Sequence, residues 1–219
     1  MTDNFEQIRG ILKFDLPEHF YYVQLLKRQS DDPLVDGKKD PAYHGNMHSR
    51  SLKNYYFRDL KTFDAKRAEI IKYCDANNVR AYIRLNRRSN KAVDMEMYEH
   101  IYSCLKNGTF KSPEYLLASA CGKVNSEPKA TRSWLIDVDA EYMPYLKDIK
   151  EAANIARSSY SGTAVLHEIP SKHGMHLITH PFNKQDYMYY WKAFTSGAAD
   201  IPQVPAAVHQ DNPTILYAP

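Results

Sequence analysis

Residues 133–142 read SWLIDVDAEY, a stretch in which apolar residues alternate with two acids, Asp137 and Asp139. Successive side chains of a strand point to opposite faces of the sheet, so the pattern predicts a strand with one apolar face and both carboxylates on the other. Two carboxylates on one face repel each other unless a cation lies between them. Hard divalent ions such as Mg²⁺ or Mn²⁺ take oxygen ligands of this kind. An acidic strand end balanced by surface lysines is the alternative interpretation.

A second polar cluster lies in PSKHGMHLIT (170–179), where Ser171, Lys172 and His173 precede a glycine. His176 then begins an apolar run that predicts another strand. A short turn with a hydroxyl group, a cation and free backbone N–H groups suits phosphate oxygens. A tight hairpin that carries an incidental pair of histidines is the simpler alternative.

A third acid, Asp211, stands before the short predicted strand 214–218 in HQDNPTILYAP (209–219). An aspartate before an Asn-Pro turn is usually a turn residue. It matters here because a site with two acids needs a third carboxylate, for which Asp200 is the poorer candidate.

Hydrophobic periodicity predicts the remaining elements. We expect helices near 63–77, 92–106, 144–156 and 185–195, and strands at 79–85, 163–168 and 175–179. The helix at 92–106 places one row of residues on its apolar side: Val93, Met97, Ile101, Cys104 and Leu105. The strand at 79–85 alternates, with a basic exposed face of Arg80, Tyr82 and Arg84. Together the elements of the C-terminal half predict an α+β fold, a sheet with helices packed on it.

Composition excludes several classes of protein. No apolar run approaches the ~20 residues that a membrane helix needs, and the N-terminus lacks the pattern of a secretory signal. The 3 cysteines form neither an even disulfide set nor a CxxC pair. We therefore expect a cytoplasmic or nucleoid-associated protein that is not secreted and does not contact a membrane.

Charge is distributed unevenly along the chain. Residues 38–91 contain 14 Lys and Arg against 5 Asp and Glu, a net charge of +9. Because the whole chain carries +3, the remaining residues carry −6. A basic part joined to an acidic part fits a phosphate-rich partner and a metal site, although a solvated basic surface explains the charge equally well.

The order of the three motifs resembles the archaeo-eukaryotic primase superfamily. WLIDVD is similar to its first motif, which implies Asp137 and Asp139 as metal ligands. The family's second motif resembles SKHGMH, with nucleotide-binding roles for four residues of that turn: Ser171, Lys172, His173 and His176. DNPTILYAP looks like the third, with Asp211 as the remaining ligand. Lys172 departs from the family, which often has glycine after the serine.

The resemblance implies a fold and an activity. Residues 132–219 would form the catalytic half, with an RRM-like antiparallel or mixed sheet, and 1–131 an N-terminal α/β subdomain with a basic surface. The activity would be template-dependent transfer of a nucleotide from a nucleoside triphosphate to a 3′-hydroxyl, with two Mg²⁺ or Mn²⁺ ions. A helicase or an accessory priming domain would lie on another chain, or this chain would be a core from which such a domain has been removed.

A template strand would bind through the basic segment YIRLNRRSNK (82–91). Phosphates would meet four side chains of this region: Arg84, Arg87, Arg88 and Lys91. Bases could stack on Tyr55, Tyr56 or Tyr82. A solvated strand end is the alternative for this segment.

Three other functions remain open at this stage. The chain could be a primase-like module that binds nucleotides or nucleic acid without catalysis. HLIT (176–179) has the histidine and hydroxyl of a two-histidine phosphoesterase, but His167 and His209 do not begin a second such element. A zinc site from His44, His48 and one or two cysteines is the third alternative.

Overall fold

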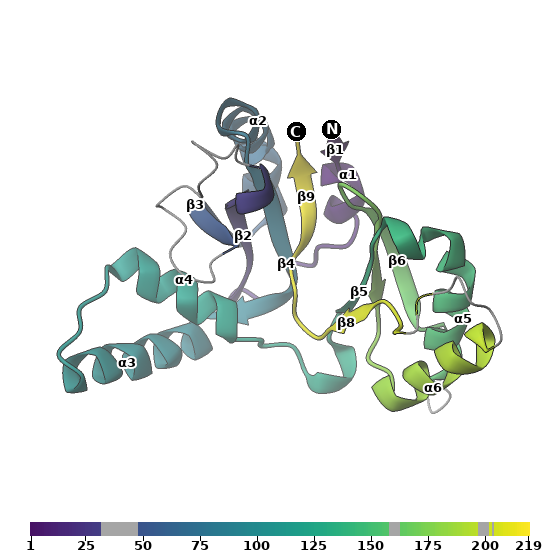
Figure 1. Cartoon of the computed structure of the whole chain (residues 1–219). Helices are drawn as coiled ribbons and strands as arrows, with labels where there is room; N and C mark the ends of the chain where they lie inside the picture. The colour runs from purple at the N-terminus through teal and green to yellow at the C-terminus, as the bar shows by residue number, and fades with distance from the viewer. Residues whose placement is uncertain (32–47, 158–162, 197–201, 203) are drawn as a thin grey trace, which may run out of the picture. The chain divides into compact units, whose positions relative to one another are not determined.

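The computed structural model describes residues 1–31, 48–157, 163–196, 202 and 204–219 (Figure 1). The predicted α+β class is confirmed: across these ranges, six helices and two sheets form two compact units. One unit comprises Met1–Glu127 with Ile215–Pro219, and the other comprises Pro128–Thr214. The boundary after Glu127 lies four residues before the expected one at 131/132, and Ile215–Pro219 group with the N-terminal unit.

The first unit is built on a five-stranded sheet of order β1-β9-β4-β2-β3. Its strands are β1 (Thr2–Asp3), β2 (His19–Arg28), β3 (Ser49–Phe57), β4 (Arg80–Ser89) and β9 (Thr214–Ala218). Its helices are α1 (Phe5–Arg9), α2 (Leu60–Asn77), α3 (Asn90–Lys106) and α4 (Pro113–Lys123), with one 3₁₀ turn, η1 (Gln29–Asp31). Strand β2 pairs antiparallel with both β3 and β4, so both of its edges are hydrogen-bonded. Its consecutive residues 20–23 are all buried, so side chains on both of its faces are covered.

Local sequence signals explain where the helices begin and end. The side chain of Asp59 accepts a hydrogen bond from the Thr62 backbone N–H at 2.7 Å and caps α2. Ser89 and Ser112 cap α3 and α4 in the same way. Gly108 has a φ of +62°, a left-handed conformation that glycine adopts without steric cost, directly after α3.

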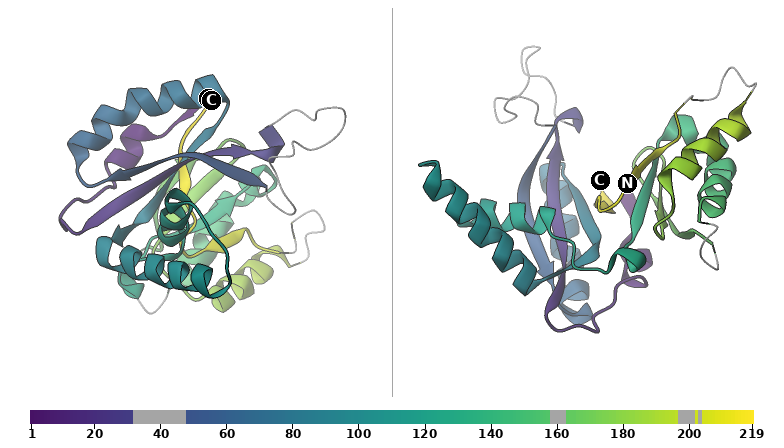
Figure 2. Two further views of the ribbon diagram at one scale, coloured as in Figure 1. Left: turned by 90° about the vertical axis from the view of Figure 1, so that its left-hand side faces the viewer. Right: turned by 90° about the horizontal axis from the view of Figure 1, so that it is seen from below.

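Two expectations for this unit are wrong. The strand predicted at 79–85 extends to Ser89 and lies inside the sheet, so Tyr82 is buried rather than exposed. In α3, Val93 is buried as expected, but Ile101 and Leu105 are exposed. Helix α4, which packs on α3 (Figure 2), is not among the predicted elements, and it covers Val93 and Met97 of the predicted apolar row.

The second unit has the element order β-α-β-β-α-β and the strand order β6-β7-β5-β8. Its elements are η2 (Lys129–Thr131), β5 (Trp134–Val138), η3 (Ala140–Tyr145), α5 (Leu146–Ile155), β6 (Val165–Pro170), β7 (Met175–Thr179), α6 (Lys184–Thr195) and β8 (Ala207–His209). All three strand pairs are antiparallel. This is the order of a split β-α-β arrangement, while the narrower RRM-like description remains a prediction.

The core of the second unit lies on one face of this sheet. Ile136, Val138 and Leu177 are buried there against the helices. Helix α5 contributes small residues such as Ala152, and α6 contributes Trp191, which is fully buried. The side chains of Asp137 and His176 alternate with these core residues, so they belong to the opposite face.

The C-terminal strand β9 is tied to the first unit by its backbone. Asn4 donates from its backbone N–H to the Leu216 carbonyl and from its side-chain amide to the Ile215 carbonyl, both at 3.0 Å. The hydroxyl of Tyr217 donates to Asp75 at 2.7 Å. Within the described ranges, no helix is long and apolar enough to cross a membrane.

An ion-pair cluster between α2 and β3 gives the first prediction. The carboxylate of Glu69 accepts from Lys53 at 2.7 Å, from Lys66 at 2.6 Å and from the Tyr55 hydroxyl at 2.9 Å. The hydrogen bond from Lys53 is the largest of the causes that lower the pKa of Glu69 to about 2. A carboxylate with a lowered pKa stabilises the fold above its unfolded pKa of ~4.3, and this contribution is lost as the pH falls toward 2.

We therefore expect Glu69→Gln to weaken the pH dependence of stability between pH 5 and pH 2.5. Urea unfolding at both pH values should show a smaller loss of unfolding free energy in the variant than in the parent chain. Glu18→Gln, the same change at an exposed glutamate, serves as control and should behave like the parent. An equal loss in Glu69→Gln and the parent would contradict the prediction.

Candidate active site at the end of strand β5

The pairing of β5 with β7 brings the first two sequence motifs together. The strands are antiparallel, with Asp137 directly opposite His176 and Val138 opposite Met175. Residues directly opposite in such a pair have Cα atoms ~4.5–5.5 Å apart. The acid of one motif and the histidine of the other are therefore neighbours, although 39 positions separate them in the chain.

The turn between β6 and β7 lies directly on the end of β5, and this close approach requires a glycine. A Cβ atom at Gly174 would lie 2.0 Å from the Val138 carbonyl oxygen and 3.1 Å from the Asp139 Cα. The Ser171 backbone N–H donates to the Gly174 carbonyl at 3.0 Å and closes the turn. Lys172 and His173 are exposed at its tip.

His176 is held between two polar partners. Its Nδ1 lies 2.8 Å from the Thr214 hydroxyl, and its Nε2 lies 3.4 Å from a carboxylate oxygen of Asp137. The His176 side chain is 9% exposed, whereas the Asp137 side chain is 39% exposed. The histidine therefore joins a buried hydroxyl to a solvent-accessible acid. Thr214 is absent from the predicted site, since only a contact across 38 positions reveals it.

Asp139 extends the acidic end of the strand into solvent. It is exposed, and its backbone remains extended, with φ −67° and ψ 168°. Its carbonyl accepts a hydrogen bond from the Tyr142 N–H at 2.9 Å and starts η3. Both carboxylates, Asp137 and Asp139, are thus accessible oxygen donors, which fits Mg²⁺ or Mn²⁺ in the chemistry of the ligands.

The third predicted ligand, Asp211, is not grouped with the pair. Strand β8 pairs Ala207 with Asp137 and His209 with Leu135, so the chain moves away from the acids as it approaches Asp211. It returns by Thr214, which contacts His176. Among the described residues, no three His, Cys, Asp or Glu side chains form a group that could hold a metal ion. The role of Asp211 remains a prediction.

The four basic residues of the predicted template site differ in exposure. Arg88 is fully buried, and its Nε donates to the Cys121 carbonyl of α4 at 2.8 Å. Its guanidinium therefore links β4 to α4 inside the first unit. Arg87 is 12% exposed and pairs with Glu127, and this pair raises the pKa of Arg87. Arg84 is half-buried, and Lys91 alone of the four is exposed. The expectation of a surface phosphate contact is therefore wrong for Arg88.

The tyrosines predicted to stack on bases are also largely committed to packing. Tyr55 and Tyr82 are buried. Tyr56 is half-buried and stacks on Tyr22, with ring centroids 5.5 Å apart, and burial raises the pKa of Tyr56 to about 12. These rings stabilise the sheet of the first unit rather than presenting free faces to a nucleic acid.

The structure bears unequally on the alternatives. His176 and Thr179 lie on opposite faces of β7, so they cannot act together as a phosphoesterase element. His44 lies outside the described residues, which leaves the zinc alternative untested. Cys74 and Cys121 are buried, and burial raises the pKa of each thiol to about 12.

No family model, curated protein or solved structure matches this chain. The function must therefore be argued from the geometry of the site and from the motifs themselves.

The packing of Gly174 gives the second prediction. We expect Gly174→Ala to destabilise the second unit by about 2–3 kcal/mol, since the added methyl group overlaps backbone atoms that cannot move aside cheaply. Urea unfolding monitored by tryptophan fluorescence measures the change.

Gly122→Ala is the matched control, because a Cβ atom at that helical glycine would meet nothing within 4 Å. There the same substitution should be neutral or stabilise by about 0.5–1 kcal/mol. If both variants unfold at the same urea concentration, the turn does not depend on the glycine.

Proposed function

We propose that this chain is a template-dependent nucleotidyltransferase of the primase-polymerase type, which adds nucleotides to a 3′-hydroxyl. The observation that carries the proposal is the direct pairing of Asp137 with His176 across β5 and β7. It joins the acids and the phosphate-binding turn of two separate motifs at one sheet end. The resemblance of the three motifs to the archaeo-eukaryotic primase superfamily and the split β-α-β order of the second unit support the same assignment.

Asp137 and Asp139 would hold the divalent ions, with Asp211 as the proposed third ligand. When bound, Mg²⁺ or Mn²⁺ would supply Lewis-acid activation and neutralise charge on the phosphates. In the reaction the 3′-hydroxyl oxygen attacks the α-phosphorus, the bond from that phosphorus to the β-phosphate oxygen breaks, and pyrophosphate leaves. The hydroxyl proton passes to solvent or to a nearby base.

The turn of the second motif would bind the triphosphate. Lys172 is exposed at its tip and carries the positive charge that phosphate oxygens need. His176 is buried beside Asp137, so its role would be to position the Asp137 carboxylate and the phosphates relative to each other. Such positioning and charge neutralisation dominate the catalysis of phosphoryl transfer.

Template binding would rest on fewer residues than the motif analysis predicts. Lys91 is the exposed member of the predicted basic set. Its contribution to affinity should be electrostatic and should fall with salt. The proposed partners are nucleoside triphosphates and single-stranded or primed DNA.

A second candidate is a module that binds nucleotides without transferring them. It is favoured by one observation: within the described residues, Asp211 does not join the other two acids in a group that could hold a metal. The two candidates predict different results in the same assay, because only the enzyme extends a primer.

The third prediction tests the two acids. The double variant Asp137→Asn/Asp139→Asn should lose primer extension by more than ~100-fold, because amides replace the anionic ligands without a change in size. The assay combines a homopolymer template, Mg²⁺ or Mn²⁺ and each set of triphosphates, with and without a primer.

Glu151→Gln makes the same acid-to-amide change once, at an exposed site on α5, and this control should extend normally. Full extension by the double variant would reject the proposed enzyme. Nucleotide binding without extension by the parent chain would favour the second candidate.

The fourth prediction concerns Thr214. Thr214→Val removes the hydroxyl from His176 Nδ1 at nearly constant volume, and we expect extension to fall by ~10-fold or more. Thr214→Ser keeps a hydroxyl and should restore most of the rate. Urea unfolding of both variants separates positioning from folding. Equal extension rates for the valine and serine variants would show that the hydroxyl does not position His176.

A further inference from the structure

Helix α3 has two apolar rows, and only one of them is buried. Val93, 2% exposed, and Met97 pack in the core with residues of α4. The second row consists of four residues spaced three, four and three positions apart: Met95, Tyr98, Tyr102 and Leu105. They are 56%, 69%, 69% and 64% exposed, in that order. Ile101, 38% exposed, borders it. We call these five exposed residues the α3 stripe.

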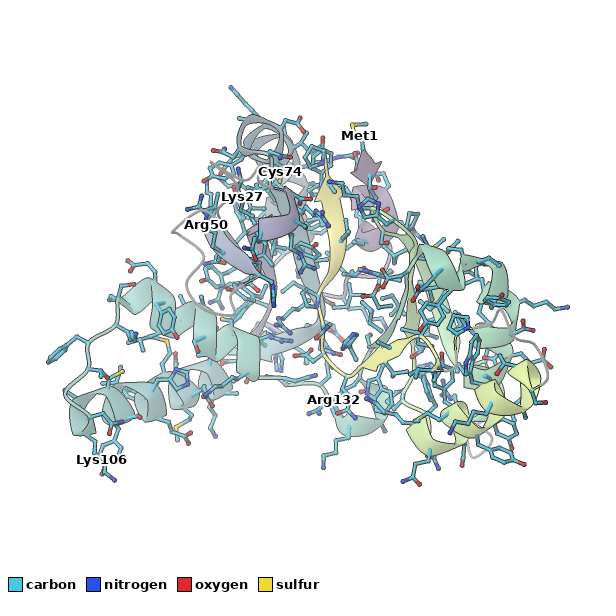
Figure 3. The ribbon with its side chains drawn as sticks, in the orientation of Figure 1. Met1, Lys27, Arg50, Cys74, Lys106 and Arg132 are labelled. Carbon is cyan, nitrogen blue, oxygen red and sulfur yellow. The ribbon has the colours of Figure 1, made fainter. Side chains whose placement is uncertain are left out.

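The spacing of the stripe is that of a helix-packing seam. Apolar residues that alternate three and four positions apart form one continuous line along a helix, the pattern by which two helices interlock. The line from Met95 to Leu105 is ~15 Å long at 1.5 Å per residue. Figure 3 labels Lys106 at the outer end of this helix.

The area of the stripe is close to what a dimer interface needs. Phe110, 84% exposed, lies just beyond the helix. At about 200 Å² for each large side chain, the five residues of the stripe present roughly 600 Å² of exposed surface. A standard interface buries ~800 Å² on each partner. The largest apolar patch on a typical monomer is ~300–600 Å², so the stripe lies at the upper end of that range.

The charges that flank the stripe favour a second copy over a nucleic acid. Lys91, Asp94, Glu99 and Lys106 are exposed along its borders, and their charges sum to zero. A surface that binds phosphates needs a net positive charge, and this one has none. Two copies of a neutral face do not repel each other.

We propose that the α3 stripe docks on the α3 stripe of a second copy of this chain, with the two helices antiparallel. A two-fold axis makes such an interface self-complementary. Met95 of each copy then meets Leu105 of the other, and Tyr98 meets Tyr102. The aromatic pairs fill the centre of the interface, where rigid aromatic side chains contribute most. The proposal is independent of the nucleotidyltransferase assignment.

Sedimentation equilibrium of the full chain from ~1 to 200 µM tests the association. The parent chain should dimerise, and Tyr98→Glu/Tyr102→Glu should weaken dimerisation by more than ~10-fold because it buries charge at the centre. The control is Tyr189→Glu, the same kind of substitution made once at a tyrosine 68% exposed on α6, and it should dimerise like the parent. A parent chain that stays monomeric throughout, or a stripe variant that dimerises as well as the parent, overturns the proposal.

Cross-linking tests the orientation. In a Cys104→Ser background, a mixture of Met95→Cys and Leu105→Cys chains should be joined by a short bis-maleimide linker. Either variant alone should not, because its two thiols would lie ~15 Å apart along the axis. The remaining cysteines are buried. Cross-linking of Met95→Cys to itself, without the mixed product, would overturn the antiparallel arrangement.

Fluorescence anisotropy with labelled oligo(dT) tests whether the α3 stripe binds single-stranded DNA instead of a second copy of the chain. The stripe variant should bind the oligonucleotide as the parent does. Loss of DNA binding in the stripe variant, together with a monomeric parent, would assign the surface to single-stranded DNA and overturn the proposal.

Discussion

The close approach of Gly174 to the Val138 carbonyl is the contact on which the candidate site depends. A side chain at position 174 would overlap the backbone of β5, so only glycine lets the β6–β7 turn lie there. Because the turn lies there, β7 starts opposite Val138, and its second residue, His176, falls opposite Asp137. A shift of one residue in this register would move His176 to the core face of the sheet. The site geometry thus follows from backbone packing before any side-chain contact is made.

The two faces of the second sheet differ in composition: the face opposite the helices carries Asp137 and His176 beside the buried residues Leu135 and Ile178. Helices α5 and α6 cover one face, where Trp191 and the alanines of α5 build a continuous core. This leaves the opposite face available for polar side chains at no cost to that core. His176 can be buried there because its ring has a hydroxyl partner in Thr214 and a carboxylate neighbour in Asp137, whereas an unpartnered imidazole would lose its hydrogen bonds to water.

Sequence periodicity predicted the elements that have one apolar face and one polar face. Strands β5, β7 and β9 and helices α2, α5 and α6 occur close to where alternation or helical spacing placed them.

The predictions that failed have physical causes. Strand β4 lies between two others, so Tyr82 is buried on the face that alternation assigned to solvent. Arg88 is buried because α4 supplies a carbonyl to it, and α4 was missed although Ser112 and Pro113 are typical of a helix start. Local sequence also does not reveal which sheet β9 joins, since that pairing spans the whole chain.

The position of Asp211 is limited by two anchors that the sequence does not reveal. His209, two residues before it, is paired with Leu135 in the sheet, and Thr214, three residues after it, is bonded to His176. An extended chain spans ~3.3–3.6 Å per residue, so the backbone of Asp211 lies within ~11 Å of Thr214. The Thr214 hydroxyl contacts His176, which in turn contacts Asp137. The path of the four residues 210–213 between these anchors therefore sets the position of Asp211, which does not form a metal-binding group with the other two acids among the described residues. The Asn-Pro step inside that segment restricts its conformations, since proline limits both its own φ and the residue before it. The Asn-Pro pair after Asp211, which identifies Asp211 as a turn residue in the sequence, therefore limits the directions in which the Asp211 carboxylate can point.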